Sequence, residues 1–347
     1  MNIIGPDLLV FGVDDVAACT QYVTDYGLIA KGGGRFEALD GTGLQILSKD
    51  DPSLPTELET SASLRKTVYG VADQKTLDAI DVELCKDRTV KHLDDGSLEA
   101  VDDLGFTLGF QVSVRTLLSL PSEVINAPGS PAQRGINNVG VQKEASPMPR
   151  SLSHVVYFVP DFAKAEAFYR DRLGFVTTDR FIGVGPFMRP AGTDDHHTLF
   201  FIQTPPHMQG LEHFTFHMGG PTEVMQAGTN MVNKGYQSFW GPGRHLFGSN
   251  WFWYFKSPFG CNMEYDADMD LHDANWVARD APPGADNSQA FLLEHREKWA
   301  PMGPPPGKGP PAGKGPPAGK GPPAGKGPPA DKEPPADKEP PAGKPKS

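Results

Sequence analysis

Cysteine, long apolar runs and an amino-terminal basic segment are all scarce in this chain. Its 347 residues include three cysteines, Cys19, Cys85 and Cys261, which are too few and too scattered for a disulfide framework or a zinc-ribbon spacing. No apolar run approaches the ~20 residues that a membrane-spanning helix needs. The first residues, MNIIGPDLLVFG, lack the basic segment and apolar stretch of a secretory signal. The sequence therefore predicts a soluble, cytoplasmic protein.

Positively charged side chains are also few in the body of the chain, once the carboxy-terminal end is set apart. The whole chain carries a net charge of −11, but residues 301–347 hold eight lysines against four acidic residues, which leaves a body of net −15. So acidic a body binds polyanions poorly, and we expect neither nucleic acid nor an anionic membrane surface as a partner. About 300 residues can bury a sizeable core and usually form two domains.

The carboxy-terminal end differs in composition from the rest of the chain. From Pro301 it repeats GKGPPA with little variation and contains 17 of the 35 prolines. Such a segment has almost no apolar side chains to offset the entropy of ordering its backbone. We expect a disordered tail at 301–347, and we favour a solubilising function over a docking function.

The body contains an internal repeat. Asp7–Asp15 matches His154–Phe162 at an offset of 147 residues. Both segments are typical of a strand, a turn and then an amphipathic helix, which the second copy places at Phe162–Leu173. The same pattern recurs at Lys66–Asp73 and at His213–Gly220, where the helix is expected over Pro221–Lys234.

Four such units predict the fold class. One helix followed by several short strands favours an α+β fold of tandem βαβββ units, which form two strongly curved mixed sheets rather than a doubly wound parallel sheet. We predict modules at 1–140 and 148–290, joined by the Pro-, Gly-, Ser- and Asn-rich segment Asn126–Arg150. A curved sheet of this kind encloses a pocket on its concave face.

The second module carries a candidate set of metal ligands. His154 and His213 stand at matching positions of its two units, each opening a strand, and Glu264 on a neighbouring strand is the candidate third ligand. Each of them alone is more often structural, but a buried Glu264 beside two histidines is costly without a cation. Two imidazoles and one carboxylate leave three coordination positions free. That set suits non-haem Fe(II) with a bidentate substrate and O2, whereas a closed zinc site needs a fourth protein ligand.

Three further side chains are candidates for substrate chemistry. His197 follows His196, and strand alternation places only one of them inward. We choose His197, because Leu199 and Phe201 share its face, and keep His196 as the alternative. Two more candidates lie downstream, one in a Gly/Pro loop and one on a strand: His245 and Tyr254. The aromatic residues near these strands are candidate walls of a flat slot: Phe187, Phe200, Trp251 and Trp253.

These residues resemble a known family. The stretch Gly243-Arg-His245, then Trp253-Tyr254, Pro258-Phe-Gly260 and Glu264, resembles the signature of the type I extradiol ring-cleavage dioxygenases of the vicinal oxygen chelate superfamily. The order and spacing of six residues resemble those of catechol 2,3-dioxygenases (metapyrocatechases): His154, His197, His213, His245, Tyr254 and Glu264. The resemblance is strongest over 151–266. Ser257 and Trp253 depart from the family's usual pattern, in places that concern substrate detail.

The resemblance also explains why the first module lacks the ligands. In the family this module is a degenerate copy without metal. Here Asp7, Lys66 and Gly109 occupy the positions that match His154, His213 and Glu264.

The resemblance implies extradiol (meta) cleavage of a catechol by O2 in the catabolism of aromatic compounds. The ring would expand to a lactone and open to a 2-hydroxymuconic-semialdehyde-type product. It implies Fe(II) on His154, His213 and Glu264, with Mn(II) as the alternative metal. His197 would be the acid–base residue, while His245 and Tyr254 would hydrogen-bond the substrate oxygens. Modules of this kind commonly assemble, so we expect a homo-oligomer.

Three alternatives remain open at this stage. The same reaction on a trihydroxylated or bicyclic catechol needs only a differently shaped pocket. A glyoxalase-like isomerase or lyase would use another metal and a Glu base, and would not need His245 and Tyr254 at their spacing. A small-molecule binding protein of the same superfamily would lack the metal ligands.

Overall fold

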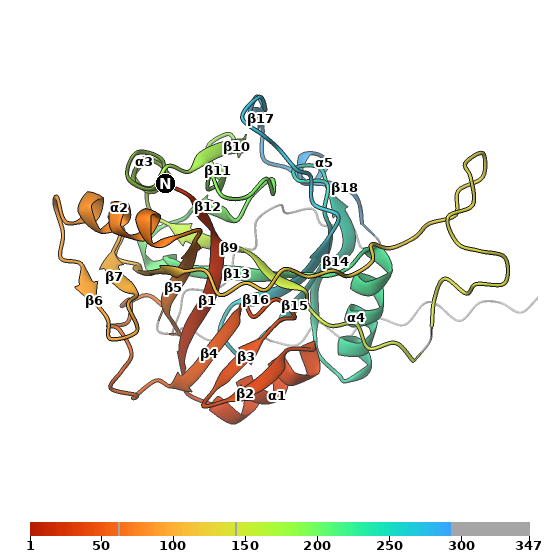
Figure 1. The fold of residues 1–347 in the computed structure, drawn as a ribbon, viewed down its shortest axis with the longest axis horizontal. Coiled ribbons are helices and arrows are strands. Elements are labelled where there is room, and N and C mark those ends of the chain that lie inside the picture. Colours follow the sequence, from red (N-terminus) through yellow and green to blue (C-terminus); the bar gives the residue numbers. More distant parts are fainter. Residues whose placement is uncertain (62, 143, 293–347) are drawn as a thin grey trace, which may run out of the picture. The chain divides into compact units, whose positions relative to one another are not determined.

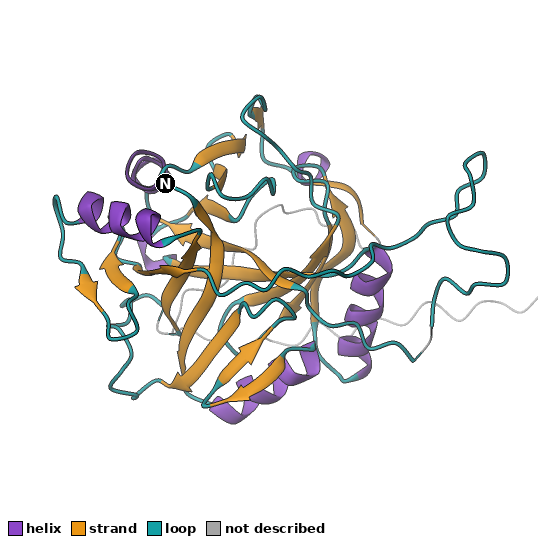
Figure 2. Ribbon diagram, viewed as in Figure 1, coloured by secondary structure: helices purple, strands orange, loops and turns teal. Residues whose placement is uncertain are grey.

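Short strands arranged in two mixed sheets, with few helices, make up the part of the chain that the structure describes (Figures 1 and 2). The structure is a computed structural model, and it describes residues 1–61, 63–142 and 144–292. The elements of the first sheet and its helices are β1 (Ile3–Val13), α1 (Val16–Tyr26), β2 (Ile29–Gly32), β3 (Arg35–Glu37), β4 (Gly43–Ser48), β5 (Leu64–Val71), α2 (Gln74–Leu84), β6 (Lys91–His92), β7 (Leu98–Val101) and β8 (Thr107–Val112).

The second sheet repeats this order and adds elements at its end. Its elements are β9 (Ser151–Val159), α3 (Phe162–Leu173), β10 (Val176–Phe181), β11 (Gly185–Arg189), β12 (Leu199–Gln203), the 3-10 turn η1 (Pro206–Met208), β13 (Gly210–His217), α4 (Pro221–Asn233), β14 (Ser238–His245), β15 (Trp251–Lys256), β16 (Asn262–Ala267), β17 (Arg279–Ala281), α5 (Ala285–Ser288) and β18 (Gln289–Leu292). The predicted α+β class and the four βαβββ units are confirmed.

The four units share one pairing pattern. In each unit the first strand pairs in parallel with the last one, and the first strands of two units pair antiparallel at the centre of the sheet, β1 with β5 and β9 with β13. The strand order is therefore β2-β3-β4-β1-β5-β8-β7-β6 in one sheet and β17-β10-β11-β12-β9-β13-β16-β15-β14-β18 in the other. The strands β17 and β18 come from the segment after the last unit and extend both edges of the second sheet.

Helix caps show where the internal repeat gains one residue. Asp15 and Asp161 are the N-caps of α1 and α3, and each side chain accepts a hydrogen bond from a backbone N–H three residues on. Gly27 and Gly174 end these helices in the left-handed conformation, with φ of 108° and 75°. The copies are thus 146 residues apart at the N-cap and 147 at the C-cap, because α3 is one residue longer.

This shift corrects one predicted equivalence. Val10 pairs with Lys66 in the first sheet, and Val156 pairs with His213 in the second. Because the offset within these strands is 146, Leu8 occupies the position of His154. Asp7, which we had matched to His154, instead lies one residue earlier. Its buried carboxylate accepts a hydrogen bond from Nε of Arg115.

The two faces of the second sheet serve different purposes. On one face, side chains of β9, β13 and β16 pack into a core shared with the first module, where the ring of Tyr26 stacks on Tyr265 at 3.9 Å and Phe11 meets Phe214 at 5.4 Å. On the other, concave face, a second apolar cluster surrounds a pocket: Val156, Phe181, Phe187, Phe200, Ile202 and Phe247. This division explains why the strands are buried on both faces.

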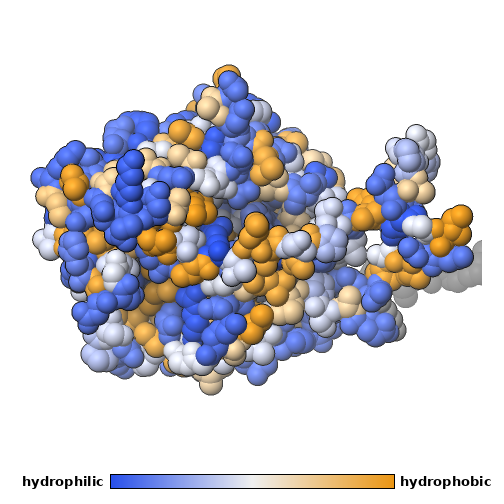
Figure 3. All heavy atoms as spheres, in the orientation of Figure 1, coloured by the Kyte–Doolittle hydropathy of each residue, from blue (hydrophilic) through white to orange (hydrophobic). Residues whose placement is uncertain are grey.

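The segment between the sheets has no helix or strand in its described parts, 113–142 and 144–150. Exposed aliphatic side chains occur along it, among them Leu117 and Ile136, and hydrophobic and hydrophilic residues mix on the face drawn in Figure 3. The limits of the modules at 1–140 and 148–290 stay a prediction, and the predicted tail at 301–347 lies outside the described residues. No helix in the described ranges is long and apolar enough to cross a membrane.

Candidate functional site

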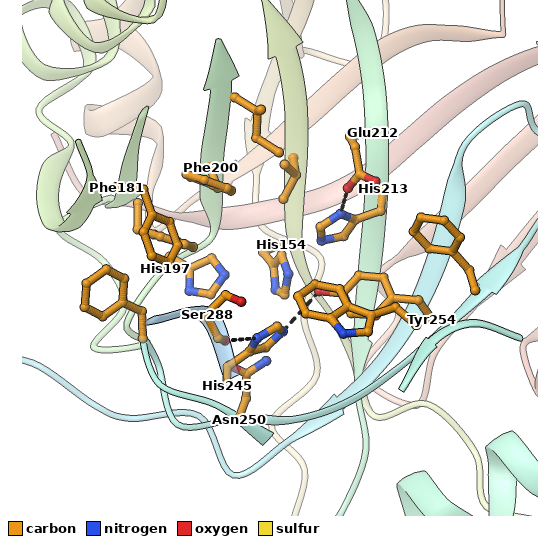
Figure 4. Close-up of a pocket in the computed structure, with 16 residues that line it drawn as sticks. His154, Phe181, His197, Phe200, Glu212, His213, His245, Asn250, Tyr254 and Ser288 are labelled. Atoms are coloured by element: carbon orange, nitrogen blue, oxygen red, sulfur yellow. Dashed lines mark hydrogen bonds and ion pairs between the residues drawn. The ribbon is translucent and has the colours of Figure 1, made fainter. Parts of the chain in front are cut away.

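Five neighbouring strands of the second sheet each bring one candidate side chain to the concave face. In the spatial order β9, β13, β16, β15 and β14 these are His154, His213, Glu264, Tyr254 and His245. His197 comes from the bend before β12, on the other side of β9 (Figure 4). We had expected His154 and His213 at the first position of their strands. Each is instead the fourth residue of its strand, near the middle of β9 and β13.

The three predicted metal ligands lie together. The candidate ligand atoms of His154, His213 and Glu264 are all within 4.8 Å of one another, and all three side chains are buried. Glu264 Oε2 lies 3.2 Å from His154 Nε2 and 3.5 Å from His213 Nε2. The hydroxyl of Thr215, the register partner of Glu264, donates to the same carboxylate oxygen at 2.6 Å.

A second carboxylate orients His213. Glu212 contacts His213 Nδ1 and itself accepts a hydrogen bond from the amide of Asn262 at 3.0 Å. This contact leaves Nε2 of His213 facing Glu264. Burial would lower the pKa of His213, but Glu212 and Glu264 outweigh it and raise the pKa to about 9. The position therefore favours a cation, either a proton or a metal ion.

Two unsatisfied atoms indicate that the residues fit a metal ion. Nε2 of His213 and Oε1 of Glu264 are buried and have no hydrogen-bond partner among the described residues. Burial would raise the pKa of Glu264, but the neighbouring imidazoles of His154 and His213 outweigh burial and hold that pKa well below its ordinary value. A buried carboxylate anion with unpaired donor atoms facing it is the environment that a divalent cation completes.

His197 borders the pocket next to the ligands. Its ring centroid is 4.4 Å from that of His154, and its side chain is buried. Burial, together with the neighbouring His154 and His196, lowers its pKa well below the ordinary value, so the imidazole is neutral at pH 7. A buried neutral imidazole beside a substrate cavity can accept a proton.

Our choice of His197 was supported by the wrong reason. The residue precedes strand β12, so strand alternation does not apply to it. It lines the pocket with Phe200 and Ile202, whereas Leu199 and Phe201 pack into the core on the opposite face. His196 is also buried but does not line the pocket.

His245 and Tyr254 lie on the other side of the ligands. His245 Nε2 is 3.2 Å from the hydroxyl of Tyr254 and 3.7 Å from Glu264 Oε1. Its Nδ1 donates to the backbone carbonyl of Ser288, at 3.0 Å, which leaves Nε2 to accept a hydrogen bond. Burial and the nearby Glu264 raise the pKa of Tyr254 well above its ordinary value, so the hydroxyl keeps its proton.

The pocket itself is apolar away from these groups. It has about 620 Å³ of space outside the protein atoms, part of it continuous with solvent. In the described part of the chain no lysine or arginine lines it. Its walls are aromatic and aliphatic: Val156, Phe181, Phe187, Phe200, Ile202, Phe239, Trp240 and Phe247. Phe187 and Phe200, which we had proposed as walls, stack on each other at 3.9 Å.

Two predicted wall residues point elsewhere. Trp251 and Trp253 alternate with Tyr254 along β15 and face the opposite side of the sheet, where Trp253 packs against Gly228 of α4. Sequence reasoning also missed Glu212, Trp240 and Ser288. Glu212 had a signal, an acidic residue directly before a predicted ligand, whereas Ser288 belongs to a segment with no motif.

Comparisons with known proteins agree with this architecture. Residues 151–265 match the model of the Glyoxalase/Bleomycin resistance protein/Dioxygenase superfamily. Metapyrocatechase 2 from Cupriavidus necator is 37% identical over 163 residues, which cover 46% of this chain and 49% of that protein. The match thus spans about half the length of the curated relative.

Solved structures extend the likeness to both sheets. The Mn(II)-bound glyoxalase from Novosphingobium aromaticivorans is similar with a TM-score of 0.67, at 18% identity, over 88% of this chain and 97% of that one. The 2,3-dioxygenase LapB from Pseudomonas sp. KL28 is similar with a TM-score of 0.63, at 18% identity, over 81% and 98%. A catechol 2,3-dioxygenase gives 0.61, at 16% identity, over 86% and 100%. The chain therefore has the vicinal oxygen chelate fold, and its resemblance to the extradiol dioxygenases of that superfamily is confirmed.

Proposed function

We propose that this protein is an extradiol dioxygenase that opens the ring of a catechol with O2 and gives a 2-hydroxymuconic-semialdehyde-type product, in the catabolism of aromatic compounds. One observation carries the proposal. The two-His-one-Glu cluster lies between a neutral His197 on one side and the pair His245 and Tyr254 on the other. A glyoxalase-like isomerase needs the cluster but has no use for that pair. The similarity to a metapyrocatechase supports the same reaction.

The proposed metal is Fe(II), with Mn(II) as the alternative, held by His154, His213 and Glu264. Such an ion would bind both catechol oxygens and O2 at its three remaining positions and conduct electron density from the ring to O2. Glu264 reduces the formal charge of the site to +1, so a catechol monoanion is the substrate form that makes it neutral. Oligomeric assembly is a further part of the proposal.

His197 is the proposed acid–base residue. Its low pKa leaves one ring nitrogen free to take the proton of a substrate hydroxyl, and the resulting imidazolium can return that proton when the ring opens. Its side chain is only 4% exposed, and Phe187 lies 5.0 Å from its ring, centroid to centroid. The proton therefore moves between two groups that are held in contact.

His245 and Tyr254 are the proposed holders of the substrate oxygens. Tyr254 offers a hydroxyl proton, and His245 offers the Nε2 lone pair that the Ser288 carbonyl leaves free. A donor and an acceptor beside each other distinguish an ionised catechol oxygen from a protonated one. The pair thereby fixes which oxygen of the substrate stays ionised.

The apolar walls favour a particular class of catechol. A carboxylate on the ring would be buried among Phe181, Phe187 and Phe247 without a cationic partner from the described residues, and burying an unpaired charge is strongly unfavourable. An alkyl or chloro substituent gains from the same surroundings. The proposed substrates are therefore catechols with apolar substituents, including bicyclic ones if the walls admit a second ring.

The reaction is tested by loading the chain anaerobically with ferrous iron, adding catechol and then admitting air. The proposal predicts O2 uptake together with a yellow ring-fission product. A reversible spectral change without O2 uptake would indicate a binding protein instead. Two variants compare a pocket residue with a surface residue: Tyr254→Phe and His207→Gln. His207 serves as the control, because it is an exposed histidine in η1. The first variant should turn over more slowly and the second at the wild-type rate.

A further inference from the structure

We propose that Asp179 and His196 are positioning residues that fix the tautomer of His197, so that its Nε2 faces the pocket without a proton. The inference rests on the proposed function, because it explains how His197 is prepared to act as a base. It concerns groups behind the pocket wall, which touch neither the candidate metal ligands nor the pocket.

The three side chains form a continuous hydrogen-bonded row. Oδ2 of Asp179 is 2.7 Å from Nε2 of His196, and Nδ1 of His196 is 2.9 Å from Nδ1 of His197. Asp179 and His196 are fully buried, at 0% exposure each. Asp179 lies on β10 and its contact with His196 spans 17 residues of chain, so the row is built by tertiary structure rather than by sequence neighbours alone.

The direction of each hydrogen bond follows from the groups themselves. A carboxylate only accepts, so His196 donates to Asp179 through Nε2–H. A neutral imidazole carries a single N–H, so Nδ1 of His196 must accept. The donor to it is Nδ1–H of His197, and the remaining ring nitrogen of His197, Nε2, is left with a lone pair. That nitrogen is on the edge of the ring away from His196, and the side chain of His197 lines the pocket.

Arg279 is the cation that pairs with Asp179 at the end of this row. It donates to Asp179 Oδ1 from Nε at 3.0 Å and from its backbone N–H at 2.8 Å, so the charge of Asp179 is already balanced. Arg279 begins β17, which pairs with β10. The second imidazole against His196, that of His272 at 5.3 Å, is itself uncharged at neutral pH, because burial and His196 lower its pKa.

The row also suits the moment after proton transfer. When a substrate hydroxyl gives its proton to Nε2 of His197, the imidazolium keeps Nδ1–H directed at His196, whose Nε2–H points to Asp179. The imidazole of His196 and the carboxylate of Asp179 thus stabilise the positive charge of His197, and no further proton moves. No other bond is made or broken, and the return of the proton restores the starting tautomers.

Replacing Asp179 by Asn should reverse the direction of the hydrogen bonds along the row. The amide nitrogen of Asn, at the position of Oδ2, can donate to Nε2 of His196 but must displace Nη2 of Arg279, which donates to that oxygen in the wild type. The amide oxygen, at the position of Oδ1, can still accept from the Arg279 backbone N–H. His196 then carries its proton on Nδ1 and donates to His197 Nδ1, which drives the proton of His197 to Nε2. The same exchange behind the catalytic histidine of serine proteases lowers kcat about 10⁴-fold because it selects the wrong tautomer.

The first measurement is steady-state turnover of iron-loaded Asp179→Asn with catechol. We expect kcat to fall about 10²- to 10⁴-fold, with KM and iron content unchanged. The control is Glu166→Gln, which removes a carboxylate that pairs with Arg180 of the same strand β10 but touches neither histidine. It should keep the wild-type kcat. An Asp179→Asn variant that folds, binds iron and retains its kcat overturns the proposal.

The second measurement reads the tautomers directly. In the zinc-loaded full-length chain with ¹⁵N-labelled histidine, NMR should show His197 protonated at Nδ1 and His196 at Nε2, with both reversed in Asp179→Asn. A wild-type His197 protonated at Nε2 overturns the proposal even if the variant does not fold. This readout is independent of activity. If iron-loaded wild type leaves catechol intact, the proposed function fails while the tautomers are still tested.

Discussion

The proposed chemistry of this pocket depends most on the buried carboxylate of Glu264. Two imidazoles converge on it, one of its oxygens lacks a hydrogen-bond partner in the described chain, and its pKa lies well below the ordinary value. An isolated carboxylate in such a place would neutralise itself by taking up a proton. The surrounding histidines prevent this, and they do so with nitrogen atoms that are also the candidate metal ligands.

His197 gives the most direct prediction at this scale. His197→Gln keeps a polar side chain of similar length but cannot exchange a proton near neutral pH. We expect kcat for catechol to fall about 10²- to 10⁴-fold, while the bound iron, measured by metal analysis, stays the same. Equal turnover in variant and wild type would assign the proton transfer to another group.

Glu212 gives a prediction about the metal rather than the substrate. Glu212→Gln removes the negative charge next to His213 Nδ1 but leaves an oxygen that can accept its hydrogen bond. Residues behind a metal-binding histidine typically change metal affinity 10- to 100-fold, and we expect a loss of that size in competition with a chelator. Glu223→Gln, which loses an ion pair with Arg150 remote from the cluster, is the control and should bind metal normally. Equal affinities in the two variants would contradict this role for Glu212.

At the scale of elements, helix α4 holds the strand that carries Tyr254. Gly228 on α4 lies against Trp253 of β15, and a Cβ added at Gly228 would sit 2.1 Å from the indole. Substituting Ala for Gly inside a helix normally stabilises by about 1 kcal/mol. Here overpacking should reverse the sign and destabilise by ~1–3 kcal/mol, seen as a lower Tm. Gly284→Ala, where a Cβ meets open space, is the control. A Tm at or above the wild-type value for Gly228→Ala would show that this contact yields easily.

His217 links β13 to β16 and to the loop that leads to His197, and it gives a pH-dependent prediction. Its Nδ1 lies 2.7 Å from Asp266 and its Nε2 lies 3.9 Å from Asp195. Burial would lower the pKa of His217, but the two carboxylates outweigh it and raise the pKa to about 10. The folded state therefore holds this proton more tightly than the unfolded state, whose pKa is about 6.5.

The stabilisation from His217 is fully present below pH 6.5 and is lost as the pH rises through about 10. Between pH 7 and 10 the Tm of wild type should fall more steeply than that of His217→Gln, as measured by calorimetry. Parallel curves would show that the ion pairs of His217 contribute no pH-dependent stability.

The elements also show how far sequence can go. Strand–turn–helix patterns repeat locally, so the four units, the helix Phe162–Leu173 and the spacing of the candidate ligands could be predicted. The exact match between the two modules could not be predicted, because α3 is one residue longer than α1. The offset before these helices is therefore 146 residues, and Leu8 instead of Asp7 matches His154. Contacts that join distant segments could not be predicted either, such as Arg279 with Asp179, 100 residues apart. No periodic pattern marks the segment after β16, although it closes both edges of the sheet.

At the scale of the molecule, two copies of one architecture have diverged in chemistry. The first-module positions equivalent to the ligands carry Leu8, Lys66 and Gly109, which offer no comparable set, and Lys66 is paired with Glu99 instead. Its aromatic side chains pack behind the second sheet in the shared core. The first module thus supports the sheet whose concave face carries the candidate site.

The central claim is that one ferrous ion on His154, His213 and Glu264 is required for O2 to react with a catechol. It is tested most directly by titrating the metal-free chain with Fe(II) under anaerobic conditions and measuring the rate of O2 uptake with catechol after each addition. The account predicts a linear rise that breaks at one iron per chain in wild type and no rise in Glu264→Ala. Uptake that is independent of added iron, or an equal response in Glu264→Ala, would contradict it.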